Sequence, residues 1–308
     1  MSPARPDSPA APGGLVAPDD QAGGIAPVSL RAAGLAYRLE RVPGSPVTVV
    51  FENAMVCSTT EWAWVLEHLR GRLSTLAYDR AGIGDSRRAP RGLTAAAKVA
   101  ELRALQRALG LHPPYVLVGH SVGGLLCRSY AWRHPDDVAG VALVDSSDPS
   151  QVSGWDQDAL RGHVSFGHRL LALAGRTAAG RHGRLDDVLP DLPLPERRRA
   201  LEQLRNPGMY LTCAAELRAY RRSWCADAAR WNTAPGPGPA VFVSAEETLT
   251  GNPKHARRQQ AVIDAVPGAR HVVVSGSDHE TVVTDRGHAA EVAAVIAEVA
   301  GLPVGSAR

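Results

Sequence analysis

The sequence predicts an α/β fold in which helices flank a mostly parallel central sheet. From about residue 35 onward, short apolar runs rich in β-branched residues alternate with longer stretches of helical periodicity. Strands that alternate with helices in this way form parallel sheets covered on both faces. In addition, one apolar run stops at a serine held between glycines, Gly119-His120-Ser121-Val122-Gly123, a pattern typical of a tight turn between a strand and a helix.

Each expected element follows from a local pattern. Strands are expected where apolar residues alternate or run without a break, at 35–40, 47–51, 73–78, 115–119, 138–144, 240–244 and 270–274. Helices are expected where apolar residues recur every three or four positions, at 61–70, 93–109, 122–133, 254–266 and 286–300. Glycines and prolines separate several of these elements, as in Pro-Gly-Ser-Pro at 43–46.

The alternation of strands and helices stops after Asp145. Residues 150–233 contain helical stretches broken by prolines, and they contain no convincing strand. Strands return after the hinge Pro-Gly-Pro-Gly-Pro at 235–239. We therefore expect a helical cap that is inserted into the α/β core.

The expected domain division has three parts. Residues 1–27 are rich in Pro, Ala and Gly and lack the pattern of a signal peptide, so they are expected to form a disordered leader. The core is expected at 28–149 and 234–308, and the cap at 150–233.

Composition limits the classes of partner. With 308 residues, of which 44% are hydrophobic, the chain can bury a sizeable core. A formal net charge of +3 gives no reason to expect a nucleic acid or an anionic membrane as partner. The four cysteines have no zinc-like spacing and are expected to be reduced thiols. Because no apolar run approaches the length of a membrane span, we expect a cytoplasmic protein.

Ser121 has the sequence surroundings of a nucleophile. The preceding strand delivers it to a turn so tight that the backbone is strained, and Gly119 and Gly123 leave room where side chains would collide. The helix after the turn directs its N-terminal N–H groups and its dipole toward this position, which favours an oxyanion formed beside the hydroxyl. We therefore interpret the segment as a nucleophile elbow.

Three motifs make the chain, from about residue 35 to 300, resemble the α/β-hydrolase fold family with a helical cap. Tyr-Asp-Arg-Ala-Gly-Ile-Gly-Asp-Ser at 78–86 is similar to the family's loop after the fourth strand, and 119–124 is similar to its elbow. Gly-Ser-Asp-His at 276–279 resembles the loop after the last strand that carries the catalytic histidine. The family includes esterases, lipases, thioesterases, peptidases, lyases and cofactor-free haloperoxidases. The resemblance therefore implies the fold but leaves the reaction open among these classes.

His279 is the candidate base. A serine hydroxyl needs a base with a pKa near the working pH, and histidine supplies one. His279 follows the apolar run 272–274 through a Ser/Gly loop, which predicts a place at the same sheet edge as Ser121. His120, next to the nucleophile, is expected to be a structural hydrogen-bonding residue.

The resemblance also implies two donors for the oxyanion hole. They are the backbone N–H groups of Val122, which follows the nucleophile, and of Met55, in the loop after the third strand. Where the family commonly has His-Gly before the second donor, this chain has Asn53 and Ala54.

The acid of the triad departs from the family pattern. Most members place an aspartate after the seventh strand, where this chain has Thr248. Some members take the acid from the end of the sixth strand instead, and Asp145 occupies that position, where it can accept the Nδ1 proton of the histidine. Asp145 is our first candidate, and the alternatives are Glu246, Glu247 and Asp148.

Other chemistries find no support in the motifs. Gly82-Ile83-Gly84 lacks the third glycine of a dinucleotide fingerprint, and 119–124 lacks the lysine of a phosphate loop. The chain has no H-E-x-x-H motif, so neither a cofactor nor a metal is expected. A serine instead of an aspartate at the elbow argues against a dehalogenase or epoxide-hydrolase mechanism.

These observations predict a serine hydrolase that cleaves a carboxylic ester, thioester or lactone of a small acyl substrate through an acyl-enzyme. Trp155, Trp224 and Trp231 of the expected cap suggest an apolar acyl pocket. Two alternatives stay open. The same triad can serve cofactor-free perhydrolysis, as in haloperoxidases, or a biosynthetic lyase or cyclase, and a member of the fold can bind ligands without catalysis.

Overall fold

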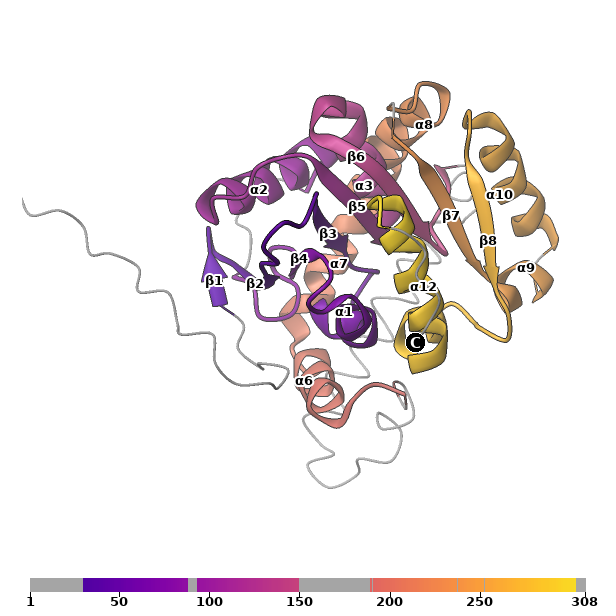
Figure 1. Cartoon of the computed structure of the whole chain (residues 1–308). Coiled ribbons are helices and arrows are strands. Elements are labelled where there is room, and N and C mark those ends of the chain that lie inside the picture. Colours follow the sequence, from indigo (N-terminus) through magenta and orange to yellow (C-terminus); the bar gives the residue numbers. More distant parts are fainter. Residues whose placement is uncertain are drawn as a thin grey trace, which may run out of the picture.

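A computed structural model of the protein describes residues 30–87, 93–149, 189, 191–236, 238–251 and 253–302. In this part of the chain, an eight-stranded sheet forms the centre of the molecule (Figure 1). Its strands are β1 (Leu30–Ala32), β2 (Leu35–Glu40), β3 (Thr48–Glu52), β4 (Ser74–Tyr78), β5 (Tyr115–His120), β6 (Val138–Val144), β7 (Ala240–Ala245) and β8 (Arg270–Val274). Their order in the sheet is β1-β2-β4-β3-β5-β6-β7-β8.

The sheet is mostly parallel, which confirms the predicted fold class. Strands β4, β3, β5, β6, β7 and β8 are parallel, whereas β2 pairs with β1 and β4 in the antiparallel direction. All seven predicted strands are present within a residue or two of the expected bounds. β1 was not predicted, because three residues are too short for a pattern. It joins β2 through a tight turn in which Ala33 and Gly34 have φ of 51° and 81°.

Both faces of the central strands β3, β5, β6 and β7 are mostly buried, and successive residues of each of these strands face opposite layers. Val49 and Phe51 belong to the apolar cluster that includes α1 (Ala63–Leu69) and α12 (Arg286–Val299). Val50, between them, belongs to the cluster that includes α2 (Ala95–Ala108), α3 (Gly123–Arg133) and α10 (Pro253–Ala265). Figure 1 shows α1 and α12 in front of the sheet, with α2 and α3 toward the back.

The predicted helices are also present, with two additions. The expected helix at 61–70 begins with a 3₁₀ turn at Thr59–Trp62 and continues as α1. Two short helices were not predicted, because one or two turns carry no periodicity: α9 (Glu246–Gly251), directly after β7, and α11 (Thr281–Thr284), after the loop that follows β8. Both lie in loops at the carboxyl edge of the sheet.

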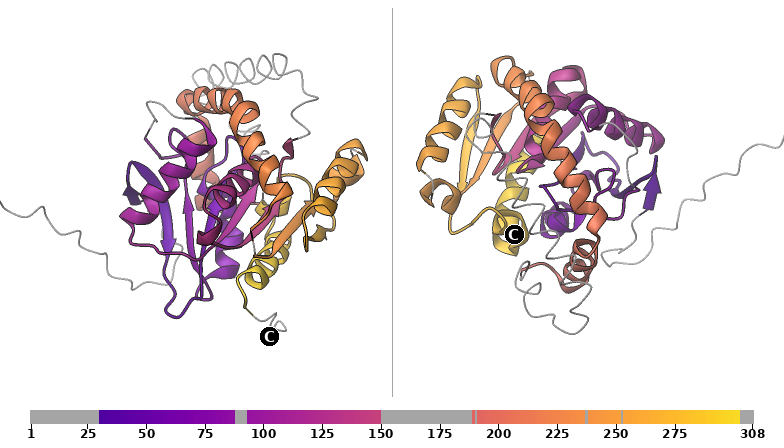
Figure 2. Two further views of the ribbon diagram at one scale, coloured as in Figure 1. Left: turned by 90° about the horizontal axis from the view of Figure 1, so that it is seen from above. Right: turned by 180° about the vertical axis from the view of Figure 1, so that it is seen from behind.

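Helices fill the described part of the segment between β6 and β7. They are α6 (Leu194–Leu204), α7 (Pro207–Ala219) and α8 (Cys225–Thr233), and a π-helical turn at Tyr220–Trp224 joins the last two. Figure 2 shows this long helical run crossing behind the sheet. Tyr220, Trp224 and Ala228 pack in one apolar cluster with Val122 of the elbow, and Met209 packs with Ile83 and Met55.

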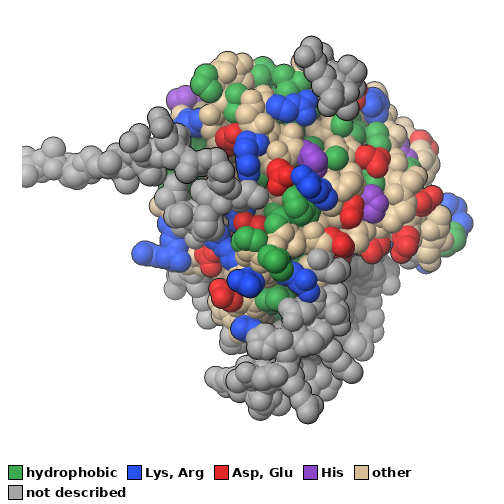
Figure 3. Space-filling model, turned by 60° about the horizontal axis from the view of Figure 1, so that its bottom comes forward, with side chains coloured by type: hydrophobic (Ala, Val, Ile, Leu, Met, Phe, Trp, Pro, Cys, Tyr) green, Lys and Arg blue, Asp and Glu red, His purple; other side chains and the backbone are tan. Residues whose placement is uncertain are grey.

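Several expectations fall on residues outside the described part of the chain, including the leader at 1–27, Trp155 and most of 150–190. The helical cap and the domain boundaries therefore stay predictions, whereas Trp224 and Trp231 are buried between helices and core. Among the described helices, none combines the length and the hydropathy that a membrane-spanning segment needs. On the described part of the face in Figure 3, acidic and basic side chains are interspersed.

Candidate active site

Ser121 occupies a strained turn between β5 and α3. Its φ of 53° lies in the left-handed region, which a residue with a side chain rarely adopts. The turn requires Gly119, because a Cβ at this position would lie 2.6 Å from the backbone of Gly123 and Gly124. The resulting geometry holds the serine hydroxyl above the carboxyl end of the sheet, as the sequence motif predicts.

His279 lies between Ser121 and Asp145. Its Nε2 is 3.0 Å from Ser121 Oγ, and its Nδ1 is 2.6 Å from Asp145 Oδ2. The three residues come from the loops after β5, β6 and β8, so the parallel sheet brings their strand ends to one edge. A carboxylate only accepts, so Nδ1 carries the proton and Nε2 is left to accept the serine O–H.

The carboxylate of Asp145 is held on both oxygens. The Ala245 N–H donates to Oδ1 at 3.2 Å, and the Thr248 hydroxyl donates to Oδ2 at 2.8 Å. Burial by itself raises the pKa of Asp145, but the hydrogen bond and the charge of His279, together with the Thr248 hydrogen bond, outweigh it and the net pKa is lowered. Asp145 is therefore an ionised partner for the histidine.

The alternative acids are directed elsewhere. The carboxylate of Glu246 accepts a hydrogen bond of 2.7 Å from the Gly276 N–H, and the Glu247 N–H donates to the Ser277 carbonyl. Asp148 lies 3.9 Å from a guanidinium nitrogen of Arg128. The structure thus brings Asp145 to His279, whereas the carboxylates of Glu246 and Asp148 face other groups and the Glu247 side chain is exposed.

The two expected oxyanion donors flank the elbow. Val122 directly precedes α3, and Met55 lies in the loop after β3 and packs in the same apolar cluster as Val122. Asn53 fixes the start of this loop, because its amide donates to the Tyr78 carbonyl at 2.9 Å and its oxygen accepts from Trp62 Nε1 at 2.9 Å. Within the described residues, neither the Val122 nor the Met55 N–H donates a hydrogen bond to a protein acceptor.

His120 lies behind His279 and does not contact Ser121. Its Nε2 donates to the His279 carbonyl at 2.8 Å, and its Nδ1 is 3.0 Å from Glu61 Oε2. Burial alone lowers the pKa of His120, but the negative charge of Glu61 and their hydrogen bond give a net rise. The structure agrees with a hydrogen-bonding role for His120, whereas no sequence pattern indicates that Glu61 is its partner.

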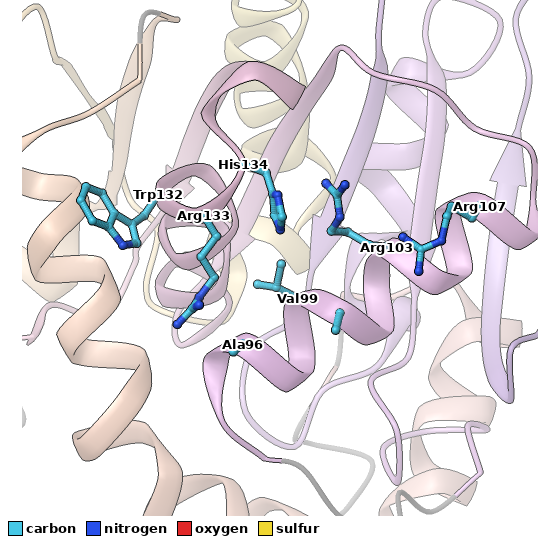
Figure 4. Close-up of a pocket in the computed structure, with 8 residues that line it drawn as sticks. Ala96, Val99, Arg103, Arg107, Trp132, Arg133 and His134 are labelled. Atoms are coloured by element: carbon cyan, nitrogen blue, oxygen red, sulfur yellow. The ribbon is translucent and has the colours of Figure 1, made fainter.

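Two hollows lie near these elements. One, of about 200 Å³, adjoins the site and is lined by residues of the loop after β3, of the segment between β6 and β7, and of α11, among them Met55, Leu204, Met209 and Val283. The other, of about 590 Å³, lies between α2 and α3, and its lining includes no residue of the triad. Figure 4 shows Arg103, Arg107 and His134 around this second hollow. Within the described residues, no group of three or more His, Cys, Asp or Glu side chains is placed to hold a metal ion.

The comparisons with known proteins identify the family. The model of the alpha/beta hydrolase fold matches residues 47–285, so the chain belongs to the alpha/beta hydrolase fold family. Over 113 residues the chain is 34% identical to an uncharacterised protein of Bacillus subtilis, YqjL, covering 36% of this chain and 45% of that protein. Over 102 residues it is 33% identical to a (lyso)-N-acylphosphatidylethanolamine lipase of Bos taurus, covering 30% of each chain.

The matches thus span less than half of the length of these curated relatives. Among solved structures, an esterase from Thermogutta terrifontis superposes with a TM-score of 0.61 at 19% identity, covering 86% of this chain and 93% of that one. This likeness concerns the fold.

Proposed function

We propose that the protein is a serine hydrolase that cleaves a carboxylic ester, thioester or lactone through an acyl-enzyme, with Ser121, His279 and Asp145 as its catalytic residues. The observation that carries the proposal is the continuous hydrogen-bonded relay from Ser121 Oγ through His279 to Asp145. A nucleophile, a base and an orienting acid in this order are the requirements for acyl transfer by serine.

In the proposed reaction, Ser121 Oγ attacks the carbonyl carbon while its proton passes to His279 Nε2. The carbonyl oxygen becomes an oxyanion, which the N–H groups of Val122 and Met55 stabilise. Collapse of the tetrahedral intermediate breaks the bond to the leaving group, which takes the proton from His279. Water then attacks the acyl-enzyme by the same route, releases the acid and regenerates the serine.

The hydrogen bonds of His279 also bear on the alternatives. A ligand-binding protein without catalysis has no need of an ionised carboxylate on Nδ1 of a histidine that faces a strained serine, so the relay supports an enzyme. Perhydrolysis and biosynthetic elimination or cyclisation can use the same three residues. A panel of esters, thioesters and lactones, with and without hydrogen peroxide, distinguishes these reactions.

The primary test is turnover of p-nitrophenyl acetate by Ser121→Ala. We expect this variant to fold and to lose turnover by several orders of magnitude, because the nucleophile is absent. Ser129→Ala is the matched control, since the Ser129 hydroxyl only donates to the Leu125 carbonyl within α3. A fluorophosphonate should label Ser121 in the wild type; full turnover in Ser121→Ala, or labelling of another serine, would contradict the proposal.

A further inference from the structure

The side chain of Arg80 is fully buried beneath the loop that carries Met55. Its Nη1 donates to the Asn53 carbonyl at 2.6 Å, and its Nη2 donates to the Ala54 carbonyl at 3.2 Å. Two consecutive carbonyls of one loop are thus held by one planar guanidinium. Lysine, with a single nitrogen, cannot reproduce this geometry.

Because the peptide bond is planar, the hydrogen bond from Arg80 to the Ala54 carbonyl also sets the orientation of the Met55 N–H. In a planar trans peptide unit, the carbonyl and the following N–H point in opposite directions. Because Arg80 holds the Ala54 carbonyl, the Met55 N–H points away from Arg80. The preceding unit is held at both ends, since the Ala54 N–H donates to Glu61 Oε1 at 2.8 Å.

Glu216 of α7 fixes the guanidinium from its other side. Its two carboxylate oxygens lie 3.3 Å from Nε and Nη2 of Arg80. A fourth partner, Glu52 at the end of β3, lies 3.7 Å from Nη1. The two carbonyls and Glu216 accept four of the five N–H groups of the arginine side chain, so the guanidinium is fixed from two sides.

We propose that Arg80, oriented by Glu216, is a positioning residue that aims the Met55 N–H at the oxyanion, an inference that rests on the proposed function. Glu216 lies on a helix of the insert between β6 and β7. The ion pair therefore connects the insert to the oxyanion loop. A displacement of α7 would loosen Arg80 and, through it, the Met55 donor.

The variants Arg80→Lys and Glu216→Gln test the inference. Loss of one oxyanion donor costs about 100- to 1,000-fold in kcat, so a loosened donor in Arg80→Lys should cost about 10- to 100-fold with little change in KM. Glu216→Gln keeps the arginine on both carbonyls and should show a smaller loss in the same direction. Lys98 lies 3.4 Å from both Glu216 and Glu101. Glu101→Gln is therefore the control, because it changes a carboxylate beside the same lysine that makes no hydrogen bond or ion pair with Arg80.

A comparison of an ester with its thionoester separates positioning from general structural damage. The sulfur of C=S is a weak hydrogen-bond acceptor, so a thionoester gains little from the oxyanion hole. The kcat of Arg80→Lys should fall for the ester and change much less for the thionoester, which lowers the ratio of the two rates. An unchanged ratio in whichever of the two variants folds would overturn the inference.

A crystal structure of Arg80→Lys, or of Glu216→Gln if the first variant does not fold, gives a readout that does not depend on turnover. We expect the Ala54 carbonyl to turn and the Met55 N–H to leave its wild-type direction. If Ser121→Ala retains full ester turnover, the hydrolase proposal fails, and this structure still decides whether Arg80 sets the loop. An unmoved Ala54 carbonyl would then refute the inference.

Discussion

The hydroxyl of Thr248 donates a 2.8 Å hydrogen bond to Oδ2 of Asp145. Thr248 occupies the position after β7 where most members of the family carry the triad acid. In this chain the carboxylate, Asp145, follows β6 instead, and the residue after β7 donates a hydrogen bond to it. The same oxygen accepts from His279 Nδ1, and the threonine therefore helps to direct the carboxylate toward the histidine.

Replacing Asp145 by Asn should lower kcat by about 1,000- to 10,000-fold, because an amide on Nδ1 favours the wrong tautomer of His279 and does not stabilise the imidazolium. The rate of p-nitrophenyl acetate turnover, together with the circular dichroism spectrum, checks this prediction. Asp136→Asn, on an exposed turn, is the control. If Asp145→Asn keeps near-full activity while Glu246→Gln loses it, the acid lies after β7.

The double variant Asp145→Asn/Thr248→Asp should recover part of the lost activity. It moves the carboxylate to the strand end that most of the family uses, one strand further from Ser121 in the sheet. We expect kcat to rise by about ten-fold or more over Asp145→Asn alone, measured with the same ester, because an anion again faces Nδ1. Thr248→Asn in the Asp145→Asn background, which supplies no charge, should give no recovery.

Glu52 should make the stability of the protein depend on pH. Burial raises its pKa from 4.5 to about 7, although Arg80 and the Tyr78 hydroxyl oppose this shift. Since the folded state holds the proton more tightly than the unfolded state, the contribution is fully present below pH 4.5 and is lost as the pH rises toward 7.

The variant Glu52→Gln should remove this slope. In urea unfolding, the contribution of Glu52 should lower the free energy of unfolding of the wild type by a few kcal/mol over this window, in addition to the effects of other titrating groups. The free energy of unfolding of the variant should depend less on pH. Glu67→Gln, whose carboxylate pairs with Arg286 near the surface, should keep the wild-type profile. Parallel profiles for wild type and Glu52→Gln would show that folding does not raise the pKa of Glu52.

Replacing His120 by Phe should reduce both stability and activity. The change leaves Oε2 of the buried Glu61 carboxylate without its histidine partner, which costs about 3 to 5 kcal/mol, and it frees the His279 carbonyl. Thermal unfolding should therefore occur at a lower temperature, and kcat should fall about ten-fold while Ser121 can still be labelled. His112→Phe, at an exposed position, is the control; equal effects from both substitutions would contradict the prediction.

Much of the fold and of the candidate site could be predicted from the sequence because both depend on local patterns. Ser121, Asp145 and His279 each follow a strand pattern directly or through one short loop, and the ends of parallel strands meet at one edge. The short elements β1, α9 and α11 could not be predicted, because three to six residues carry no periodicity.

The supporting contacts could not be predicted, because they join residues that are far apart in the chain and belong to no recognisable motif. Glu61 lies 59 positions from His120, and Arg80 lies 136 positions from Glu216. Neither glutamate belongs to a motif, and each is an ordinary polar residue in its own helical segment. Only the folded chain shows that both hold one loop from two sides.

The two partners of the triad hydrogen bond differ sharply in their contact with solvent. The side chain of Asp145 is 1% exposed, whereas that of His279 is 48% exposed. The Nδ1 edge of the imidazole is therefore shielded from water, whereas the rest of the ring is accessible to solvent. In the proposed reaction only Nε2 of His279 exchanges protons with the substrate and water, because Asp145 shields Nδ1. A reagent such as diethyl pyrocarbonate should therefore modify His279 at Nε2.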